Sequence, residues 1–482
     1  MAQEPRLDPS SSAVLPPDSG PGAGSWLVRL RDRDHTRAGL LGSLLVLALP
    51  SVLTGLFGGG LFQLVELDFL GRLGPGAVAA AGASNQILRQ VIFLLTFGVT
   101  IAAQMWIARQ VGMQRVEDAE HAAGQAFLLG AALAVIAAIA GGFFAEELIR
   151  AVATDPAVIA AGAVYVRITF LTLSAFIATQ IFSAVLLGAG DSTTPLVITL
   201  LSTPVSITSQ WALTFGAFGL PALGIAGIAL GAAVGGLFGV AIGGWALLTG
   251  RCRVHLRGRH FVPDPPTLRV LLGVSWQPAL HFVARSLIIM VFMWLSGRLG
   301  GAVQAAYTVG LRIEMTVIMV AFPIANACAT LVGQNLGAGD LARAWRSIYV
   351  ASAVVLAILL PAALGLYAFR EGIVAFFTDD PAVQEIAAEY LFYASFHVGI
   401  YGLYFIAFRT LQASGDMNTP MIISVTTAAL LGVPLGFGLS SYTDLGSTGM
   451  WIANLCYGAV NAVLMVSWLL TGRWARRTGV VS

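Results

Sequence analysis

The chain has 482 residues, of which 57% are hydrophobic and 10% are charged, and its mean hydropathy is +0.83. Soluble globular proteins carry about 25% charged residues, so this chain has too little polar surface to be one of them. Apolar runs long enough to cross about 30 Å of hydrocarbon as helices recur along it, without the alternation typical of membrane strands. The composition therefore predicts an all-α integral membrane protein, because spanning backbone must satisfy its own hydrogen bonds.

The first stretch, residues 1–25, is rich in proline, serine, aspartate and glycine. Such a composition cannot bury a core, and we expect a disordered tail. The stretch also lacks the basic segment followed by an apolar one that marks a cleaved signal peptide. Insertion into the membrane is therefore expected to begin with the first spanning helix.

Twelve apolar segments follow, separated by short turns that contain glycine, proline and aspartate. In one of these turns, "GAGDSTTP" (188–195), Asp191 is expected to cap the next helix, with Pro195 in its first turn. We interpret this turn as helix-capping chemistry and not as a catalytic motif. The predicted spans are 40–70, 78–104, 121–145, 157–187, 195–217, 221–249, 270–297, 303–332, 344–369, 387–413, 420–441 and 446–471.

Arginine is distributed unevenly over alternate connections between these spans. Sixteen arginines lie on the side of the two termini and the central connection, against four on the other side, where acids such as Asp379 and Asp380 gather. Basic residues stay on the cytoplasmic side of a membrane, so both termini are predicted to be cytoplasmic. The chain uses arginine and no lysine, which suggests a bacterial genome and hence a bacterial plasma membrane. The sixteen are Arg29, Arg31, Arg33, Arg37, Arg109, Arg115, Arg251, Arg253, Arg257, Arg259, Arg269, Arg343, Arg346, Arg473, Arg476 and Arg477, and the four are Arg72, Arg150, Arg298 and Arg370.

The central connection, residues 250–269, contains the basic run "RCRVHLRGRH". A run of this kind can contact nucleic acid, but here both flanks are membrane spans. We therefore predict an orientation-setting cytoplasmic linker and no nucleic acid partner.

Several segments recur at a distance near 225 residues. "GRLG" at 71–74 returns at 297–300, "TDPAVIAAGAVYV" at 154–166 resembles "DDPAVQEIAAEYL" at 379–391, and "GDSTTP" resembles "GDMNTP". Six spans separate the copies, so the repeat predicts two parallel six-helix units related by an axis along the membrane normal. The predicted parts are a tail at 1–25, an N-lobe at 26–249, a linker at 250–269, a C-lobe at 270–472 and a cytoplasmic tail at 473–482, in a protein that is expected to be a monomer.

Three carboxylates lie well inside predicted spans, where an ionisable group is costly and is a functional candidate, whereas Glu389 is nearer an interface. The three are Glu66, Asp68 and Glu314. Glu66 and Asp68 are about 200° apart around a helix, so they cannot form one site. Their counterparts in the second unit are Phe292 and Trp294, and scaffolding alone does not require a carboxylate in one unit only. We therefore predict an ion or proton site at Glu66, with the alternative that either carboxylate lies partly solvated near a helix end.

Glu314 has candidate partners among the arginines of the predicted spans. They are Arg89, Arg285 and Arg409, whereas Arg312 is two positions away and lies on a different side of the helix. The expected arrangement is an internal ion pair that holds the second unit together.

Other polar side chains in the spans could line a cavity, although such groups also join helices by hydrogen bonds, and a lone histidine is more often a core residue. They are Gln180, Gln210, His281, His397, Tyr401 and Tyr404. Cysteines 252, 328 and 456 lack metal-ligand spacing and are expected to be packing residues. No phosphate-binding loop, nucleophile motif or metal motif occurs, so we expect no enzyme, no metal and no organic cofactor, and any transport would be passive or driven by an ion gradient.

Four motifs, in this order, resemble the multidrug and toxic compound extrusion (MATE) family over about residues 40–472. They are "ELDFLGRLGPGAVAAAG" (66–82), "LLGAGDSTTP" (186–195), "ATLVGQNLGAGD" (329–340) and "LQASGDMNTP" (411–420). The resemblance implies a secondary transporter that expels bulky, amphipathic, often cationic compounds in exchange for H⁺ or Na⁺. It also implies alternating access by two six-helix lobes, with drug-like small molecules and membrane lipids as partners.

The resemblance also assigns site residues. Many members carry an aspartate in the first helix that binds the coupling ion, and alignment on "RLGP" places Glu66 there. The asparagine and aspartate that some members have in the fifth helix correspond to Ser206 and Gln210, while NorM-type carboxylates in the seventh and tenth helices correspond to the neighbourhoods of Arg285 and Tyr401. One carboxylate with few oxygen neighbours favours H⁺ over Na⁺, so the chain resembles the proton-coupled DinF type more than the NorM type. The predicted site comprises Glu66 as the coupling residue and a cavity with Asp68, Gln180, Ser206, Gln210, Arg285, Glu314, His397 and Tyr401.

We expect protonation of Glu66 from the outside to remove a buried charge, repack the first unit and weaken the binding of a cationic compound. Deprotonation toward the cytoplasm then restores the binding state. A lipid-linked precursor flippase of the same superfamily is the first alternative, kept open by the arginines in the spans. An integral-membrane enzyme that uses Glu66 and Asp68 as acid and base is the second.

Overall fold

The computed structural model describes residues 34–250 and 252–476, apart from the side chains of Arg89 and Phe93. The predicted tail at 1–25 lies outside these residues, as do Arg29, Arg31, Arg33, Arg251 and Arg477. Within the described part, eleven helices are long and apolar enough to span a membrane, and the pair α6 (Pro156–Leu171) and α7 (Leu173–Ala189), bent by 49°, makes a twelfth. The prediction of an all-α membrane protein with twelve spans is confirmed.

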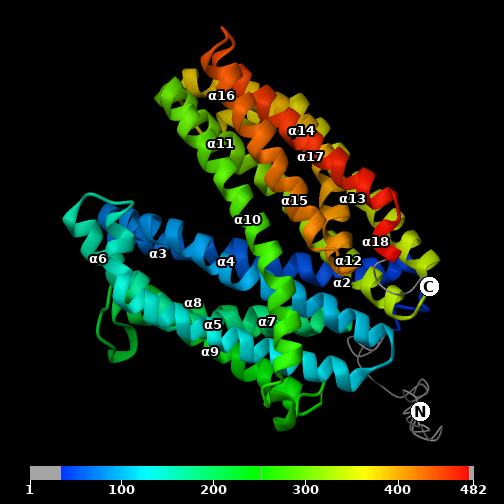
Figure 1. The fold of residues 1–482 in the computed structure, drawn as a ribbon. Coiled ribbons are helices and arrows are strands. Elements are labelled where there is room, and N and C mark those ends of the chain that lie inside the picture. Colours follow the sequence, from blue (N-terminus) through cyan, green and yellow to red (C-terminus); the bar gives the residue numbers. More distant parts are fainter. Residues whose placement is uncertain (1–33, 251, 477–482) are drawn as a thin grey trace, which may run out of the picture.

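Six spans come from the first half of the chain (Figure 1). Pro156 stands at the first position of its helix, where a missing N–H costs little, and the Asp155 side chain accepts a hydrogen bond from the N–H of Ala157. A π-helical stretch, η2 (Leu56–Leu61), joins the two parts of the first span. The other helices are α2 (Leu40–Gly55), α3 (Phe62–Leu73), α4 (Pro75–Gly112), α5 (Val116–Arg150), α8 (Thr193–Phe215) and α9 (Ile225–Leu248).

The second half repeats this order with similar capping. The side chains of Asp264, Asp340 and Asp380 accept hydrogen bonds from the first N–H groups of three of its helices. A second π-helical stretch, η5 (Ala428–Gly432), again lies inside a span. The helices are α10 (Pro265–Leu299), α11 (Gly301–Ile318), α12 (Ala321–Gly337), α13 (Leu341–Ala375), α14 (Pro381–Ala413), α15 (Asn418–Thr427), α16 (Val433–Ser441), α17 (Gly446–Leu470) and α18 (Arg473–Arg476).

The repeated "GD…TP" turn is a helix start in both halves, as predicted. Asp191 accepts hydrogen bonds from the N–H groups of Thr193 and Thr194, and Asp416 accepts one from the N–H of Thr419. These bonds satisfy N–H groups that have no partner within α8 and α15. The polar turn therefore ends one apolar helix and begins the next.

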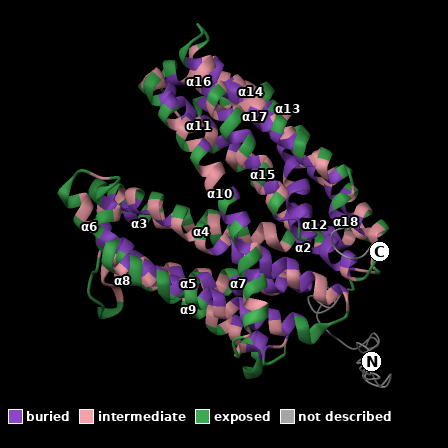
Figure 2. Cartoon of the chain, viewed as in Figure 1, coloured by how far each residue is buried: buried purple, intermediate pink, exposed green. Residues whose placement is uncertain are grey.

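The two halves form two bundles that meet at one end and diverge toward the other (Figure 1). We name the end where α4 reaches α12 the closed end, and the opposite end, where α6 and α16 lie, the open end. Figure 2 shows exposed residues along the outer faces of both bundles. Among the described residues, many exposed side chains are large and apolar, such as Leu49, Phe143, Leu364 and Leu430, as expected for a protein that faces lipid.

Each bundle has its own buried apolar cluster, and two helices cross between them. Leu44, Leu47 and Ala48 at the start of α2 pack in the cluster of the second bundle. In the same way, Leu271 at the start of α10 packs in the cluster of the first bundle. Each bundle is therefore held partly by the first turns of the helix that opens the other half.

At the closed end, α4 and α12 pack backbone against backbone. A Cβ atom on Gly112 would lie 2.1 Å from the carbonyl oxygen of Gln334, and one on Gly337 would lie 2.2 Å from that of Arg109. Gly112 and Gly337 are 225 positions apart, and so are Arg109 and Gln334. The contact is therefore reciprocal, as contacts across a two-fold axis are.

A buried polar chain adds to this contact. Nη2 of Arg409 on α14 donates to Oε1 of Gln104 on α4 at 2.5 Å, and Nε2 of Gln104 donates to Oγ1 of Thr330 on α12 at 3.0 Å. An apolar cluster of Ile101, Met105 and Met417 lies on the same interface. Both halves are thus joined by polar and apolar contacts near the closed end.

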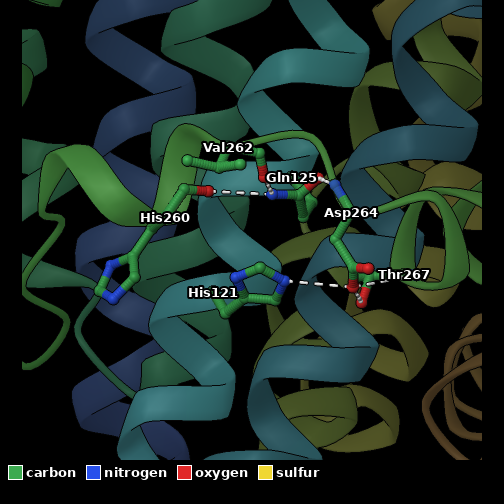
Figure 3. Close-up of polar contacts among 6 residues, drawn as sticks. All are labelled: His121, Gln125, His260, Val262, Asp264 and Thr267. Atoms are coloured by element: carbon green, nitrogen blue, oxygen red, sulfur yellow. Dashed lines mark hydrogen bonds and ion pairs between the residues drawn. The ribbon is translucent and has the colours of Figure 1, made fainter.

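The connection from α9 to α10 is packed on α5 and is not a free loop (Figure 3). Nε2 of Gln125 donates to the carbonyl oxygens of His260 and Val262 at 3.0 and 2.7 Å, and its Oε1 accepts from the N–H of Asp264 at 2.9 Å. Nε2 of His121 contacts Oδ2 of Asp264 at 3.2 Å. We refer to residues 252–264 as the docked connection.

Two titratable side chains of the docked connection are shifted by these contacts. Hydrogen bonds from Thr267 and His121 hold the pKa of Asp264 below its ordinary value. Burial lowers the pKa of the His260 imidazole, which is 2% exposed, against the opposing effect of the Glu120 carboxylate 3.9 Å away. The connection therefore carries a buried histidine next to α5.

Candidate ion and substrate site

Glu66 lies inside the first bundle, on α3. Leu73, the last residue of α3, is seven positions further on, so Glu66 is about 10 Å along the helix from the open end. Oη of Tyr165 on α6, a residue that is 6% exposed, donates to Oε1 of Glu66 at 3.1 Å. The carboxylate is partly buried and is turned toward a neighbouring helix of its own bundle.

Asp68 is separate from Glu66 and lies at the surface. Its carboxylate is exposed and pairs with Nη2 of Arg72, one turn further along the helix, at 2.9 Å. In the second half, the equivalent arginine, Arg298, lies over the ring of Trp294 at 5.0 Å. Asp68 and Trp294 therefore occupy equivalent places beside an arginine at the open end, and this arrangement does not bring Asp68 to Glu66.

The polar residues predicted in the fifth span contact α9. Ser206 and Gln210 are buried against it, and Cβ atoms on Gly235 and Gly231 would lie 2.2 Å from Ser206 and 2.3 Å from the backbone of Gln210. Gln180 on α7 is exposed. These predicted cavity residues do not form one group with Glu66 through any contact among the described residues.

Glu314 on α11 is the centre of a second buried group, in the other bundle. It is 1% exposed, accepts a hydrogen bond from Oη of Tyr390, and shares another with Nδ1 of His397. Two glycines leave room for these partners. A Cβ atom on Gly310 would lie 2.2 Å from the Tyr390 ring, and one on Gly458 would lie 2.2 Å from Nε2 of His397.

The expectation that an arginine pairs with Glu314 is wrong for two of the three candidates. Arg285 donates to Oη of Tyr401, and Arg409 donates to two glutamine side chains. The side chain of Arg89 lies outside the described residues. The rotation of α14 about its axis brings a tyrosine and a histidine to Glu314, and hydropathy in the sequence does not report that rotation.

The two tyrosines that hold the carboxylates were missed by the sequence analysis. Tyr165 and Tyr390 occupy the same place in the repeated segments at 154–166 and 379–391. Each donates a hydrogen bond to a carboxylate of its own bundle, Glu66 on α3 and Glu314 on α11. A hydroxyl retained at one position of both copies, inside an apolar segment, is the signal that would have found them.

The group around Glu314 continues toward α10. The His397 and Tyr401 rings meet edge to face with centroids 4.4 Å apart, and Tyr401 packs on Tyr404 at 4.7 Å. Tyr404 in turn shares a 3.1 Å hydrogen bond with Nε2 of His281. The predicted residues Arg285, Glu314, His397 and Tyr401 are therefore brought together in one cluster, whereas Glu66 lies in the other bundle.

Comparison with known proteins agrees with this architecture. The sequence profile of the MatE family matches residues 50–212 and 279–437, one segment in each half. A probable multidrug resistance protein NorM of Thermotoga maritima is 26% identical over 427 residues, covering 86% of this chain and 89% of that protein. The multidrug resistance protein NorM of Burkholderia vietnamiensis is 27% identical over 419 residues, covering 84% and 88%.

A solved structure supports the fold independently. A crystal structure of MATE in the bent conformation superposes with a TM-score of 0.85 at 18% identity, covering 95% of this chain and all of that one. The family profile matches once in each six-helix unit, which agrees with motifs that recur at a spacing of about 225 residues. The chain belongs to the MatE family, the multidrug and toxic compound extrusion transporters, and is a multi-pass membrane transporter and not an enzyme.

Proposed function

We propose that this protein expels amphipathic, drug-like compounds from a bacterial cell in exchange for inward H⁺, with Glu66 as the coupling residue. The observation that carries the proposal is the hydrogen bond from Tyr165 to Glu66 inside the first bundle. A carboxylate at this place can take up and release a proton next to helices that can repack. The relatives named multidrug resistance proteins support drug-like compounds as the substrates.

A proton suits this site better than a metal cation does. Among the described residues, Glu66 receives a hydrogen bond from Tyr165. A hard cation such as a metal ion instead requires a shell of several oxygen ligands. A proton needs one acceptor, and its transfer removes the charge of the carboxylate. The proposed coupling step is therefore protonation of Glu66.

The orientation of the chain follows from its arginines. The described arginines of the arginine-rich side lie in the closed-end connections or within about two turns of the helix ends that flank them. Under the rule that basic residues stay inside, the closed end faces the cytoplasm and the bundles diverge toward the outside. The described arginines of this side are Arg37, Arg109, Arg115, Arg253, Arg257, Arg259, Arg269, Arg343, Arg346, Arg473 and Arg476.

The cycle that we propose starts from this outward-open arrangement. A proton from outside neutralises Glu66, which weakens its hydrogen bond from Tyr165 and lets α3 repack against α6. A bound cationic compound then loses an attractive charge and leaves. Reopening at the closed end lets the proton leave to the cytoplasm, and drug binding must differ between the two states for the exchange to be coupled.

Replacing Glu66 with glutamine tests the proposal. In vesicles loaded with a fluorescent cation, the wild-type protein should show transport driven by an imposed pH gradient and not by a Na⁺ gradient, and Glu66→Gln should show neither. Asp68→Asn is the matched control, because Asp68 is two positions away, exposed and paired with Arg72. Transport by Glu66→Gln that still follows the pH gradient at the wild-type rate would refute the assignment.

A further inference from the structure

Arg409 is a buried cation at the contact between the two halves. It lies on α14, four positions before the last residue of that helix, and it is 3% exposed. Ile101, Met105 and Ala329 line a cavity of about 10 Å³ together with it. A space of that size has room for about one water molecule. The guanidinium is therefore buried near the closed end without a hydration shell.

The hydrogen-bond partners of this guanidinium are neutral among the residues that the structure describes. Nη2 donates to Oε1 of Gln104 at 2.5 Å, and Nη1 donates to Oε1 of Gln412 at 2.8 Å. Nε finds no acceptor in the described part of the chain, and no carboxylate there forms an ion pair with Arg409. The end of α14 contributes the partial negative charge of a helix C-terminus, which is smaller than a full counter-charge. The positive charge is therefore buried with incomplete compensation.

Opening of the closed end would expose this charge to water. Arg409 belongs to the second half and Gln104, on α4, to the first, so the bond between them breaks when α4 separates from α12 and α14. Water replaces a lost hydrogen bond at a small net cost, whereas an ion that leaves a dry site regains its hydration. The hydrogen bonds thus favour closure, the burial of the charge opposes it, and the effect of the charge is the larger of the two.

We infer that the buried charge of Arg409 favours reopening of the closed end, and so sets the balance between the outward-open arrangement and one that is open to the cytoplasm. A closed end that was sealed by uncharged groups alone would hold the outward-open arrangement more tightly and would reopen less often. Arg409 acts here as a positioning residue, because it needs to touch neither the transported compound nor the coupling ion. The inference rests on the proposed function, since it concerns the step of the proposed cycle in which the closed end reopens.

The balance can be measured as the ratio of the open to the closed population. Spin labels on Arg115 and Ala338, which are exposed beyond the ends of α4 and α12, report both populations by double electron–electron resonance in the full-length protein without native cysteines. Gly112→Ala provides a background in which both should be populated, because its Cβ atom would lie 2.1 Å from the carbonyl oxygen of Gln334. The protein is held in lipid nanodiscs at one pH, without substrate or ion gradient.

Three variants in this background separate the charge from its hydrogen bonds. Arg409→Gln removes the charge but keeps an amide donor for Gln104, and it should lower the ratio of open to closed about 10-fold or more. Arg409→Lys keeps the charge and loses the planar fork, so the ratio should not fall. Arg346→Gln is the matched control. Arg346 is an exposed arginine on α13 of the same half, and its loss should leave the ratio unchanged.

Several outcomes would overturn the inference. If the hydrogen bonds of Arg409 held the closed end shut, Arg409→Gln and Arg409→Lys would both raise the ratio. An unchanged ratio in Arg409→Gln, or an equal fall in Arg346→Gln, would remove the role of this charge, as would a single closed distance in Gly112→Ala with and without Arg409→Lys. If Arg409→Gln does not fold, Arg409→Met supplies an uncharged side chain of similar length, for which the same fall in the ratio is expected.

The measurement does not depend on the coupling ion, which keeps this inference apart from the proposed function. A ratio that falls in Arg409→Gln would stand even if the vesicle assay showed no transport driven by a pH gradient. Proton-driven transport that depends on Glu66, together with an unchanged ratio in Arg409→Gln, would defeat the role of Arg409 alone.

Discussion

A single methyl group at the closed end should open it. In Gly112→Ala, the new Cβ atom would lie 2.1 Å from the carbonyl oxygen of Gln334 and 2.8 Å from both its carbonyl carbon and its Cα. These atoms belong to the backbone of α12 and cannot rotate away, so α4 and α12 must separate. Overpacking of this kind costs about 1–3 kcal/mol, which lowers the population of the closed arrangement about 5- to 150-fold.

Gly337→Ala should act in the same way because the contact is reciprocal. Its Cβ atom would lie 2.2 Å from the carbonyl oxygen of Arg109 and 3.0 Å from Cα of Gly112. The two substitutions act on the same contact, so a separation of α4 from α12 caused by one added methyl group also removes the clash of the other. We therefore expect the double variant to cost less than the sum of the two single variants.

The assay is a distance measurement across the closed end. Spin labels on Arg115 and Ala338, both exposed, would report the separation of α4 from α12 by double electron–electron resonance after the native cysteines are replaced. Gly112→Ala and Gly337→Ala should lengthen and broaden the distance distribution. Gly273→Ala is the matched control, because it is also helical but its Cβ would meet no atom within 4 Å. Wild-type distances in both variants, with wild-type thermal stability, would refute the close packing.

Three further predictions concern other contacts. Gln125→Ala leaves backbone groups of the docked connection unpaired, so the free energy of unfolding should fall by about 1–3 kcal/mol in denaturant titrations, and an unchanged value would contradict the contact. Because burial lowers the pKa of His260, the docked connection should be most stable above about pH 6.5 and should lose stability as the pH falls below it. Hydrogen exchange of residues 252–264, corrected for intrinsic rates, measures this, and stronger protection at pH 5.5 than at pH 7.5 would reverse the sign. Glu314→Gln breaks the buried pair with His397 and should destabilise the protein by about 3–5 kcal/mol, as measured by thermal unfolding. Adding His397→Gln should recover part of this loss. Full stability of the single variant would contradict a charged pair.

The spans and the repeat could be read from the sequence because their signals are local. A run of apolar residues sets a membrane helix, and an aspartate such as Asp191 or Asp416 starts the next one through bonds to N–H groups two or three residues away. The repeat of "GRLG" and of the Tyr165 and Tyr390 segments then gives the two units without any knowledge of their packing. These features need no information on how helices rotate against one another.

The partners of the buried carboxylates could not be read in this way. Tyr165 is 99 positions from Glu66, and His397 is 83 positions from Glu314, so each contact depends on how two distant helices turn about their axes. Arginine was the natural expectation for Glu314 on charge alone. The same limit applies to the docked connection, since the basic run predicted its side of the membrane but not the buried Gln125 that holds it.

Because the first turns of α2 and α10 each pack in the opposite bundle, the two halves should stay associated without a covalent link. Leu44 and Leu47 are seated in the core of the second bundle, and Leu271 in that of the first, so the covalent tie at 252–264 is not what keeps the halves together. A protein nicked in that segment would stay in one piece in detergent. Two fragments produced separately in one cell, each with six spans, would associate because the start of α2 and the start of α10 each pack into the core of the other bundle.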